Sequence, residues 1–306
     1  MTDHPKVVIA LVNWNNKDYL DHCLESVLES DLPFAYEIVV SDNGSTDGSL
    51  ELLSQKFPQV NVLLNQENVG VARGNNLCIQ NSTGEYIYVL NNDTIVNHDS
   101  ILEMVDFLDE NSSVGAVGGN LLNPDGTLQL TYCDYPTLLE ELLIVSHIGK
   151  AMNPIFPSPK ESWTTEHEVD WISSASIMVR RSAIEEIGLN DESFFIYSDE
   201  TDWQYRLRKA GWQVFYLPRV NTIHFGGSSF RPGDRRYTLV YRGRMLFASK
   251  HYSIGYQLIQ RLMFGLAAMA RLLVWLILLP FSRTKTINRR QINSNIQTLK
   301  LALRLR

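Results

Sequence analysis

Residues 85–94 organise the fold of this chain; they read Glu85-Tyr86-Ile87-Tyr88-Val89-Leu90-Asn91-Asn92-Asp93-Thr94. Its first half is a run of β-branched and aromatic side chains, which is typical of a buried strand, and the run stops at two amides and a carboxylate. Ligands of open α/β sheets bind beyond the carboxyl ends of the strands, where Asp93 would offer a hard oxygen ligand to Mg²⁺ or Mn²⁺. The alternative is that residues 91–93 form only a turn and that Asp93 caps a helix predicted at 100–110.

The alternation of strand and helix repeats through the first 110 residues. Apolar runs that end in polar residues alternate with segments of helical periodicity, such as 17–30. The predicted strands are residues 7–12, 37–40, 60–64 and 85–90. This order predicts an α/β protein with a doubly wound, mostly parallel sheet.

Candidate ligand-binding residues follow each of these strands. Asp42 ends the second strand and is expected to bind ligand, whereas Asp47 is expected only to cap the next helix. After the third strand, Gly70 and Gly74 permit close approach of a ligand to the backbone, and the Arg73 guanidinium can bind phosphate through two N–H groups. The helix that begins here presents free N–H groups to an anion. The remaining candidates are Asn13, Asn15, Gly70, Arg73, Asn75 and Asn92.

The strand at 169–181 contains a run of small side chains. These either leave room for a substrate, which would place Trp171 and Ser174 beside it, or mark a bulge.

A later helix begins at Asp199 and Glu200. Carboxylates at a helix start complement the dipole, but the aromatic run at 194–197 would also raise the proton affinity of one of them toward that of a general base. His224 stands before paired glycines. A lone histidine is more often structural, and contact with a metal or phosphate is the alternative.

Charge is divided unevenly along the 306 residues. Residues 1–234 hold all 34 acidic residues and 13 Lys and Arg, whereas residues 235–306 hold 14 Lys and Arg and no acid. Apolar residues between these basic charges favour an anionic membrane surface over nucleic acid as the partner. Three scattered cysteines follow no disulfide or metal-ligand spacing and indicate a cytosolic protein.

The last part of the chain is apolar as well as basic. Residues 262–279 carry one charge, Arg271, and are almost long enough to span a bilayer. Arg261, Gly265, Ala268 and Arg271 recur at helical spacing, which favours a helix lying in the interface with Leu, Met and Phe facing the lipid. Spanning, soluble packing or a homodimer contact are the alternatives. We expect an α/β domain at 1–250 and a membrane-associated helical tail at 251–306.

Six stretches taken in order resemble the family 2 glycosyltransferases of the GT-A fold, particularly the rhamnosyltransferase-like bacterial members. They are residues 11–15 (LVNWN), 41–47 (SDNGSTD), 68–75 (NVGVARGN), 90–93 (LNND), 194–212 and 224–228 (HFGGS). The resemblance covers about residues 5–250. Each stretch is weak by itself, and their order makes the match specific.

The resemblance implies an inverting, metal-dependent transferase that uses a nucleotide-diphosphate sugar. Asp42 would hold the uracil or thymine base, and the donor-binding set would be Asn13, Asn15, Asp42, Gly70, Arg73, Asn75, Asn92 and Asp93. Asp93 and His224 would hold Mg²⁺ or Mn²⁺, Glu200 would be the catalytic base, and Trp171, Ser174 and Asp199 would lie on the acceptor side. Two departures are Asn91, which replaces the first Asp of the family's Asp-x-Asp, and the order Asp199-Glu200 in place of Glu-Asp.

The resemblance further implies rhamnose from dTDP-rhamnose as the transferred sugar, with UDP-hexoses second. The acceptor would be lipid-linked and presented at the cytoplasmic face of the cell membrane, in cell-surface polysaccharide synthesis.

Two other functions compete with this one. A nucleotidyltransferase would carry a Gly-rich, Lys-bearing first loop, whereas residues 13–16 read Asn-Trp-Asn-Asn. A non-catalytic membrane-bound scaffold would keep the fold without the chemistry, and the joint presence of Asp42, Asp93, Glu200 and His224 argues against it.

Overall fold

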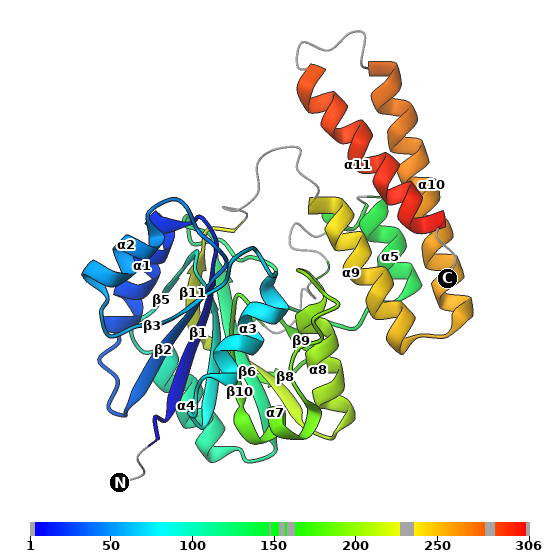
Figure 1. Cartoon of the computed structure of the whole chain (residues 1–306). Helices are drawn as coiled ribbons and strands as arrows, with labels where there is room; N and C mark the ends of the chain where they lie inside the picture. Colours follow the sequence, from blue (N-terminus) through cyan, green and yellow to red (C-terminus); the bar gives the residue numbers. More distant parts are fainter. Residues whose placement is uncertain are drawn as a thin grey trace. The chain divides into compact units, whose positions relative to one another are not determined.

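Strict alternation along the strands builds two apolar layers, one on each face of a central sheet. Side chains of Val7, Ile9 and Leu11 enter one layer, and those of Val8 and Ala10 enter the other. The computed structural model describes residues 4–146, 148–152, 157, 163–226, 236–278 and 285–303 (Figure 1). They fall into two compact units, called here the sheet unit and the helical unit.

The sheet unit comprises Met1–Tyr135, Ser158–Phe195 and Asp199–Ser229. Its strands are β1 (Val7–Asn13), β2 (Tyr36–Asp42), β3 (Asn61–Leu64), β4 (Tyr86–Asn91), β5 (Thr94–Val96), β6 (Val114–Leu122), β7 (Tyr132–Cys133), β8 (His167–Glu168), β9 (Trp171–Ile172), β10 (Ser176–Arg180) and β11 (Gln213–His224). Its helices are α1 (Lys17–Leu28), α2 (Ser49–Lys56), α3 (Val71–Gln80), α4 (Ser100–Glu110), α7 (Arg181–Ile187) and α8 (Asp199–Lys209).

The main sheet has the order β3-β2-β1-β4-β10-β6-β11-β5, with β8 paired to β11. β1 pairs in parallel with β2 and β4, and β6 with β11, whereas β10 enters antiparallel between β4 and β6. One face is covered by α1, α2 and α4, and the other by α3, α7 and α8. The predicted doubly wound, mostly parallel α/β sheet is confirmed.

Polar residues at the ends of the central strands meet at one edge of this sheet. Asn13 pairs in register with Asp42 on β2, and Val12 pairs with Asn91 on β4. β11 runs parallel to β6, and β10 is antiparallel to both β6 and β4, so His224 at the end of β11 comes to the same edge. Four strands therefore deliver their carboxyl ends to one place.

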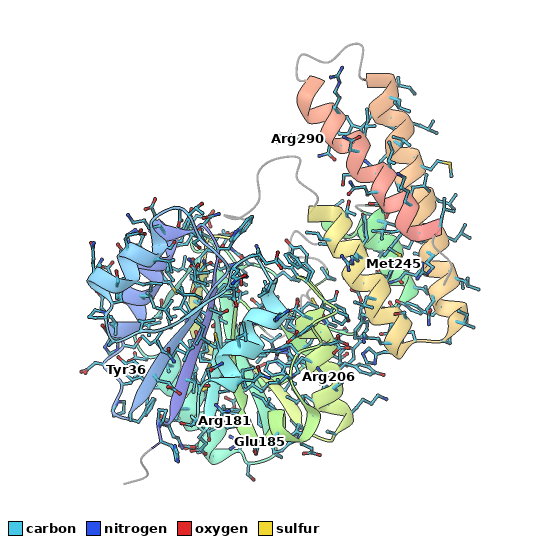
Figure 2. All side chains as sticks on the ribbon, in the orientation of Figure 1. Tyr36, Arg181, Glu185, Arg206, Met245 and Arg290 are labelled. Atoms are coloured by element: carbon cyan, nitrogen blue, oxygen red, sulfur yellow. The ribbon has the colours of Figure 1, made fainter. Side chains whose placement is uncertain are left out.

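The helical unit comprises Pro136–Pro157, Ile196–Ser198 and Phe230–Arg306. Its helices are α5 (Leu138–Val145), α6 (Ile148–Met152), α9 (Arg236–His251), α10 (Ile254–Leu278) and α11 (Lys285–Leu303). A small apolar core forms from Val145, Tyr241, Met245 on α9 and Phe264 (Figure 2). This unit takes in α5, α6 and α9 as well as the segment 251–306 that was expected to form a tail.

A buried charge cluster joins three of these helices. Arg244 on α9 donates to Glu141 (2.8 Å) and Glu140 (3.3 Å) on α5, and Gln260 on α10 donates to Glu141 (2.8 Å). Burial raises the pKa of Glu140. Since Glu141 is fully buried, Arg244 is needed to compensate its charge.

Helix α10 has one covered and one open side. Gly265 faces Ala302 and Leu299 of α11, and Arg261 donates to the Leu301 carbonyl, so α11 covers these two members of the predicted small and charged stripe. Arg271, a third member, lies over the Tyr241 ring of α9 (5.5 Å). Phe264 was expected to face lipid, but it is buried against Tyr241 because the helix packs on α9.

α10 also carries an apolar stripe of exposed side chains. Its members, 43–69% exposed, are Ile254, Leu258, Leu262, Leu266, Met269, Leu273 and Ile277. By length and composition, Ile254–Ile277 is the one described helix that could cross a membrane, and 17% of its apolar window is buried.

Candidate active site

A chain of buried amides lines the sheet edge and ends on a carboxylate. Asn16 donates to Asn92 (3.1 Å), Asn92 donates to Asn13 (2.7 Å), and Asn13 donates to Asp42 (2.8 Å). Asn92 and Asn13 each donate through the side-chain nitrogen and accept on the side-chain oxygen, so the chain runs in one direction. We call these four residues the amide chain. It links the turn after β4 to the end of β2.

Asp42 is 1% exposed and is held from two sides. One carboxylate oxygen accepts from Asn13, and the other accepts from the Ser45 main-chain N–H (2.8 Å). Asn15, in the left-handed region at φ 50°, accepts from the Thr46 N–H (2.7 Å) and so fastens the first loop to the second. Hydrogen bonds thus connect the predicted ligand residues Asn13, Asn15 and Asp42 through the loop that follows β2.

Asp47 has the structural role predicted for it. It accepts from the main-chain N–H groups of Lys17 (2.8 Å) and Ser49 (3.1 Å), at the starts of α1 and α2. Burial works to raise the pKa of Asp47, but these hydrogen bonds and that from the Ser49 hydroxyl outweigh it and lower the pKa.

The glycines before and in α3 serve packing. At Gly70 (φ +88°) an added Cβ would lie 2.5 Å from the Phe195 carbonyl oxygen, and at Gly74 it would lie 2.7 Å from a Val12 methyl. Arg73 is mostly exposed, 3.8 Å from Glu192, and Asn75 is buried on the same helix. Packing against Phe195 and Val12 therefore accounts for both glycines without a ligand. Contacts of Gly70, Arg73 and Asn75 with a nucleotide-sugar donor remain predictions.

Asp93 and His224 form the pair that the strand ends bring together. Asp93 Oδ1 lies 3.4 Å from His224 Nε2, and the Asp93 carbonyl accepts from the Phe225 N–H (2.9 Å). Asp93 does not cap α4, because β5 intervenes and the N-cap position belongs to Asp99. Gly227 and Ser228 of the 224–228 motif lie outside the described residues.

The Asp93–His224 pair has the donor atoms of a divalent-cation site. A carboxylate oxygen suits Mg²⁺ and Mn²⁺, and an imidazole nitrogen favours Mn²⁺ of the two. Among the described residues, no group of three His, Cys, Asp or Glu side chains is placed to hold a metal. An ion bound by Asp93 and His224 would take its other ligands from substrate phosphates and water.

Asp199 and Glu200 open α8 after a strained approach. Tyr197 and Ser198 both have positive φ, 67° and 65°. Asp199 is 2% exposed and Glu200 is half-buried. Burial raises the pKa of Asp199, and a hydrogen bond with Glu200 opposes that rise. Glu200 is therefore the more accessible of two interacting carboxyl groups.

Ile172 joins α8 to the segment that carries Trp171 and Ser174. The Gln204 side chain accepts from the Ile172 N–H (2.8 Å) and donates to the Ile172 carbonyl (2.7 Å). Trp171 is 8% exposed and donates to the Asp134 carbonyl (3.1 Å), and Ser174 is half-buried. Ser174 lies in the break between β9 and β10, where the Ala175 carbonyl accepts from the Asn91 N–H (3.0 Å).

The sequence reasoning missed Gln129, whose side chain contacts His224 Nδ1 (2.8 Å). The available signal was the turn Asn123-Pro124-Asp125-Gly126, which folds the chain back on β6 and returns residue 129 to the site edge. The three cysteines are buried, and burial raises the pKa of Cys23 and Cys78 to about 12, so these two thiols are unreactive.

Comparison with known proteins agrees with this geometry. The family model described as glycosyl transferase family 2 matches residues 8–188. An N-acetylglucosaminyl-diphospho-decaprenol L-rhamnosyltransferase of Mycobacterium tuberculosis is 29% identical over 246 residues, covering 73% of this chain and 76% of the relative. The rhamnosyltransferase WbbL of Escherichia coli is 27% identical over 233 residues, covering 72% and 83%.

Solved structures share the fold at low identity. The mannosyltransferase PcManGT from Pyrobaculum calidifontis, in complex with GDP-Man and Mn²⁺, superposes with a TM-score of 0.56 at 16% identity, covering 97% of this chain and 88% of that one. TarS of S. aureus gives a TM-score of 0.53 at 14% identity, covering 97% and 90%.

Proposed function

The chain belongs to glycosyl transferase family 2, and on that premise we propose that it transfers rhamnose, with inversion, from dTDP-rhamnose to a hydroxyl of a lipid-linked saccharide. The names of the M. tuberculosis and E. coli relatives support rhamnose, and that of the first supports a polyprenyl diphosphate acceptor. A UDP-hexose is the alternative donor.

The donor base would bind at Asp42. Its carboxylate is held by Asn13 and the Ser45 N–H, so it can accept from the ring N–H of thymine or uracil without moving. The amide chain fixes Asn92 relative to Asp42, which supports a donor stretched from the end of β2 to the turn after β4.

Asp93 and His224 would hold the metal, as their donor atoms fit Mn²⁺ or Mg²⁺. When bound, this ion neutralises charge that develops on the leaving diphosphate. Asn91 supplies an amide where a second carboxylate is expected, so Asp93 provides the negative charge contributed by this turn.

Glu200 would act as the general base. Its carboxylate takes the proton of the acceptor hydroxyl while that oxygen attacks the anomeric carbon on the face opposite the diphosphate. The Asp199 carboxyl, whose pKa burial raises, would act only by holding the Glu200 side chain in place through their hydrogen bond. Trp171 and Ser174 would line the acceptor side.

The Asp93–His224 pair is the observation that carries the proposal, because it places a carboxylate and an imidazole at the carboxyl edge of the strands, where open α/β sheets bind their ligands. We expect Asp93→Ala to abolish Mn²⁺-dependent binding of dTDP in calorimetry and metal-dependent hydrolysis of dTDP-rhamnose. Thr127→Ala, in an exposed turn, is the control that should retain both. Unchanged dTDP affinity in Asp93→Ala would refute the metal assignment.

Donor identity is tested separately by a thermal-shift screen of dTDP-rhamnose, UDP-glucose and UDP-galactose with Mn²⁺, since selective binding to the native state raises its stability. Stabilisation by a UDP-hexose alone would replace rhamnose with that sugar.

The apolar stripe of α10 would lie in the cytoplasmic face of the membrane, beside a lipid-linked acceptor. Its leucines are exposed, no acidic residue follows position 234, and each basic residue near an anionic leaflet contributes about 1 kcal/mol. A helix with one apolar side and one side packed on protein suits an interfacial position.

Liposome sedimentation tests this position. The protein should sediment with phosphatidylglycerol-rich vesicles at low salt and less at high salt, and the double variant Leu262→Ser, Leu266→Ser should remain in the supernatant. Leu139→Ser, an exposed leucine on α5, is the matched control that should still sediment. If the unaltered protein stays in the supernatant and is dimeric, the apolar stripe is a homodimer contact instead.

A further inference from the structure

A short hairpin carries Gln129 to the imidazole of His224. The turn at 123–126 is closed by the Asn123 N–H donating to the Thr127 carbonyl (2.7 Å), and the Gln129 N–H then donates to the Leu121 carbonyl of β6 (2.8 Å). Because β6 runs beside β11, with Leu122 paired to Ile223, residue 129 comes next to the end of β11.

The orientation of the Gln129 amide is fixed by its partners. The nitrogen donates to the main-chain carbonyl of His224, an atom that can only accept, and also to the Asn123 side-chain oxygen (2.8 Å). The Gln129 oxygen therefore faces His224 Nδ1 at 2.8 Å. A reversed amide would set two oxygens against each other at the His224 carbonyl.

This orientation decides which imidazole nitrogen carries the hydrogen. An amide oxygen has no proton to give, so the hydrogen bond requires Nδ1–H, and the neutral ring then has its lone pair on Nε2. Nε2 is the atom 3.4 Å from Asp93 Oδ1 and 3.5 Å from the Asn91 amide nitrogen, which can donate to it. The lone pair thus points at the Asp93 carboxylate, where a cation would lie between them.

We propose that Gln129 is a positioning residue that holds His224 in the Nδ1–H tautomer and so presents Nε2 as a ligand for the divalent metal. This inference rests on the proposed metal site. Asp93 and His224 come from the turn after β4 and the end of β11, whereas Gln129 comes from the hairpin that follows β6. Supporting partners of this kind typically contribute about 10–100-fold to metal affinity.

The neighbourhood leaves this contact undisturbed. Gly226, at φ +59°, has no side chain, and an added Cβ would sit 3.6 Å from the His224 ring and 3.9 Å from the Gln129 oxygen. The His224 side chain is 16% exposed, so little water reaches Nδ1 to replace Gln129.

Calorimetric titration of Mn²⁺ into the full-length protein with saturating dTDP tests the proposal, with Gln129→Met as the variant. Methionine keeps the length of the side chain and removes the acceptor. We expect Mn²⁺ affinity to fall about 10–100-fold, while binding of dTDP without metal is unchanged. Asp125→Ala is the control: it removes the side chain that accepts from Thr127 in the same turn but leaves both partners of the Gln129 nitrogen in place, and it should bind Mn²⁺ within about threefold of the unaltered protein.

A second measurement reads the tautomer directly. Long-range ¹H–¹⁵N spectra of the metal-free protein above the pKa of free histidine, with the signal assigned by comparison with His224→Ala, should show His224 protonated on Nδ1. Gln129→Met should show a mixture or the Nε2–H form. The inference fails if the unaltered protein shows Nε2–H, if Gln129→Met binds Mn²⁺ normally, or if Asp125→Ala loses as much affinity as Gln129→Met.

These outcomes separate the inference from its premise. If dTDP binding by the unaltered protein does not depend on Mn²⁺, both the metal site and the role of Gln129 are wrong. If Asp93→Ala loses Mn²⁺ and Gln129→Met does not, the metal site stands and only the role of Gln129 fails.

Discussion

Replacing Glu200 by glutamine should separate binding from chemistry. Glutamine keeps the size and polarity of the side chain but cannot take a proton, and the Glu200 carbonyl that accepts from Gln204 (3.1 Å) is unaffected. Donor affinity should therefore remain, and the rate of transfer should fall.

The size of the loss follows from the surroundings of this carboxylate. A positioned base contributes roughly 10²–10⁴ in rate, or about 2.7–5.5 kcal/mol of barrier. Because Glu200 is only half-buried, water can take up part of the proton-accepting role in the variant, so we expect a fall of about 10²–10³. Asp199→Asn should cost at most about tenfold, since this buried residue would act only through Glu200 and an amide can keep that contact.

The assay is release of dTDP from dTDP-rhamnose at saturating Mn²⁺, with dTDP affinity measured by calorimetry on the same samples. Loss of turnover with unchanged affinity in Glu200→Gln supports the assignment. If Asp199→Asn is the inactive variant and Glu200→Gln is active, the base is Asp199 and the assignment is wrong by one residue.

Three further substitutions test features of the fold. Gly70→Ala should lower the free energy of unfolding by about 1–3 kcal/mol in urea titration, because the new Cβ would meet the Phe195 carbonyl at a positive φ; an unchanged midpoint would contradict this. Arg244→Met should destabilise the helical unit by about 3–5 kcal/mol by leaving Glu140 and Glu141 buried without their cation, and urea unfolding followed by the fluorescence of Trp275 on α10 measures it. Burial raises the folded-state pKa of Asp199 above its unfolded value, so the contribution of this carboxyl to stability is full below about pH 4 and is lost as pH rises through the folded-state pKa. The Tm of Asp199→Asn relative to that of the unaltered protein should therefore increase from about pH 4 upward. A Tm difference that stays constant with pH would exclude the pKa shift.

Local patterns were sufficient to predict β1 to β4 and α1 to α4, but they did not predict β5 or β6. The helix expected at 100–110 is α4 (Ser100–Glu110), and the strand expected at 85–90 is β4 (Tyr86–Asn91). Polar strand ends could be placed at one edge because parallel strands share a direction. The sequence did not reveal that β10 enters antiparallel between β4 and β6, since pairing between residues 59–94 positions apart leaves no local signal.

Other features were missed because they depend on partners distant in sequence. Helix α5 had a readable start, the capping box Thr137-Leu138-Leu139-Glu140, in which Thr137 accepts from the Glu140 N–H (3.2 Å). The hydrogen bond from Arg244 on α9 to Glu141 on α5 could not be predicted, because Arg244 lies far from α5 in the sequence. Gly70 was predicted to allow close approach of a ligand to the backbone. The backbone of Phe195, which is distant in sequence, explains why glycine is needed at this position.

The direction of the amide chain restricts how this site can evolve. A change of Asn92 to aspartate would turn a donor into an acceptor facing the Asn13 oxygen, and a reversal of Asn13 would turn its oxygen toward Asp42. Single substitutions are therefore penalised, whereas a paired change can restore a donor opposite each acceptor. The end of β2 at Asp42 and the turn after β4 at Asn92 are consequently coupled, and a descendant that alters one end of the amide chain must rebuild the other in concert.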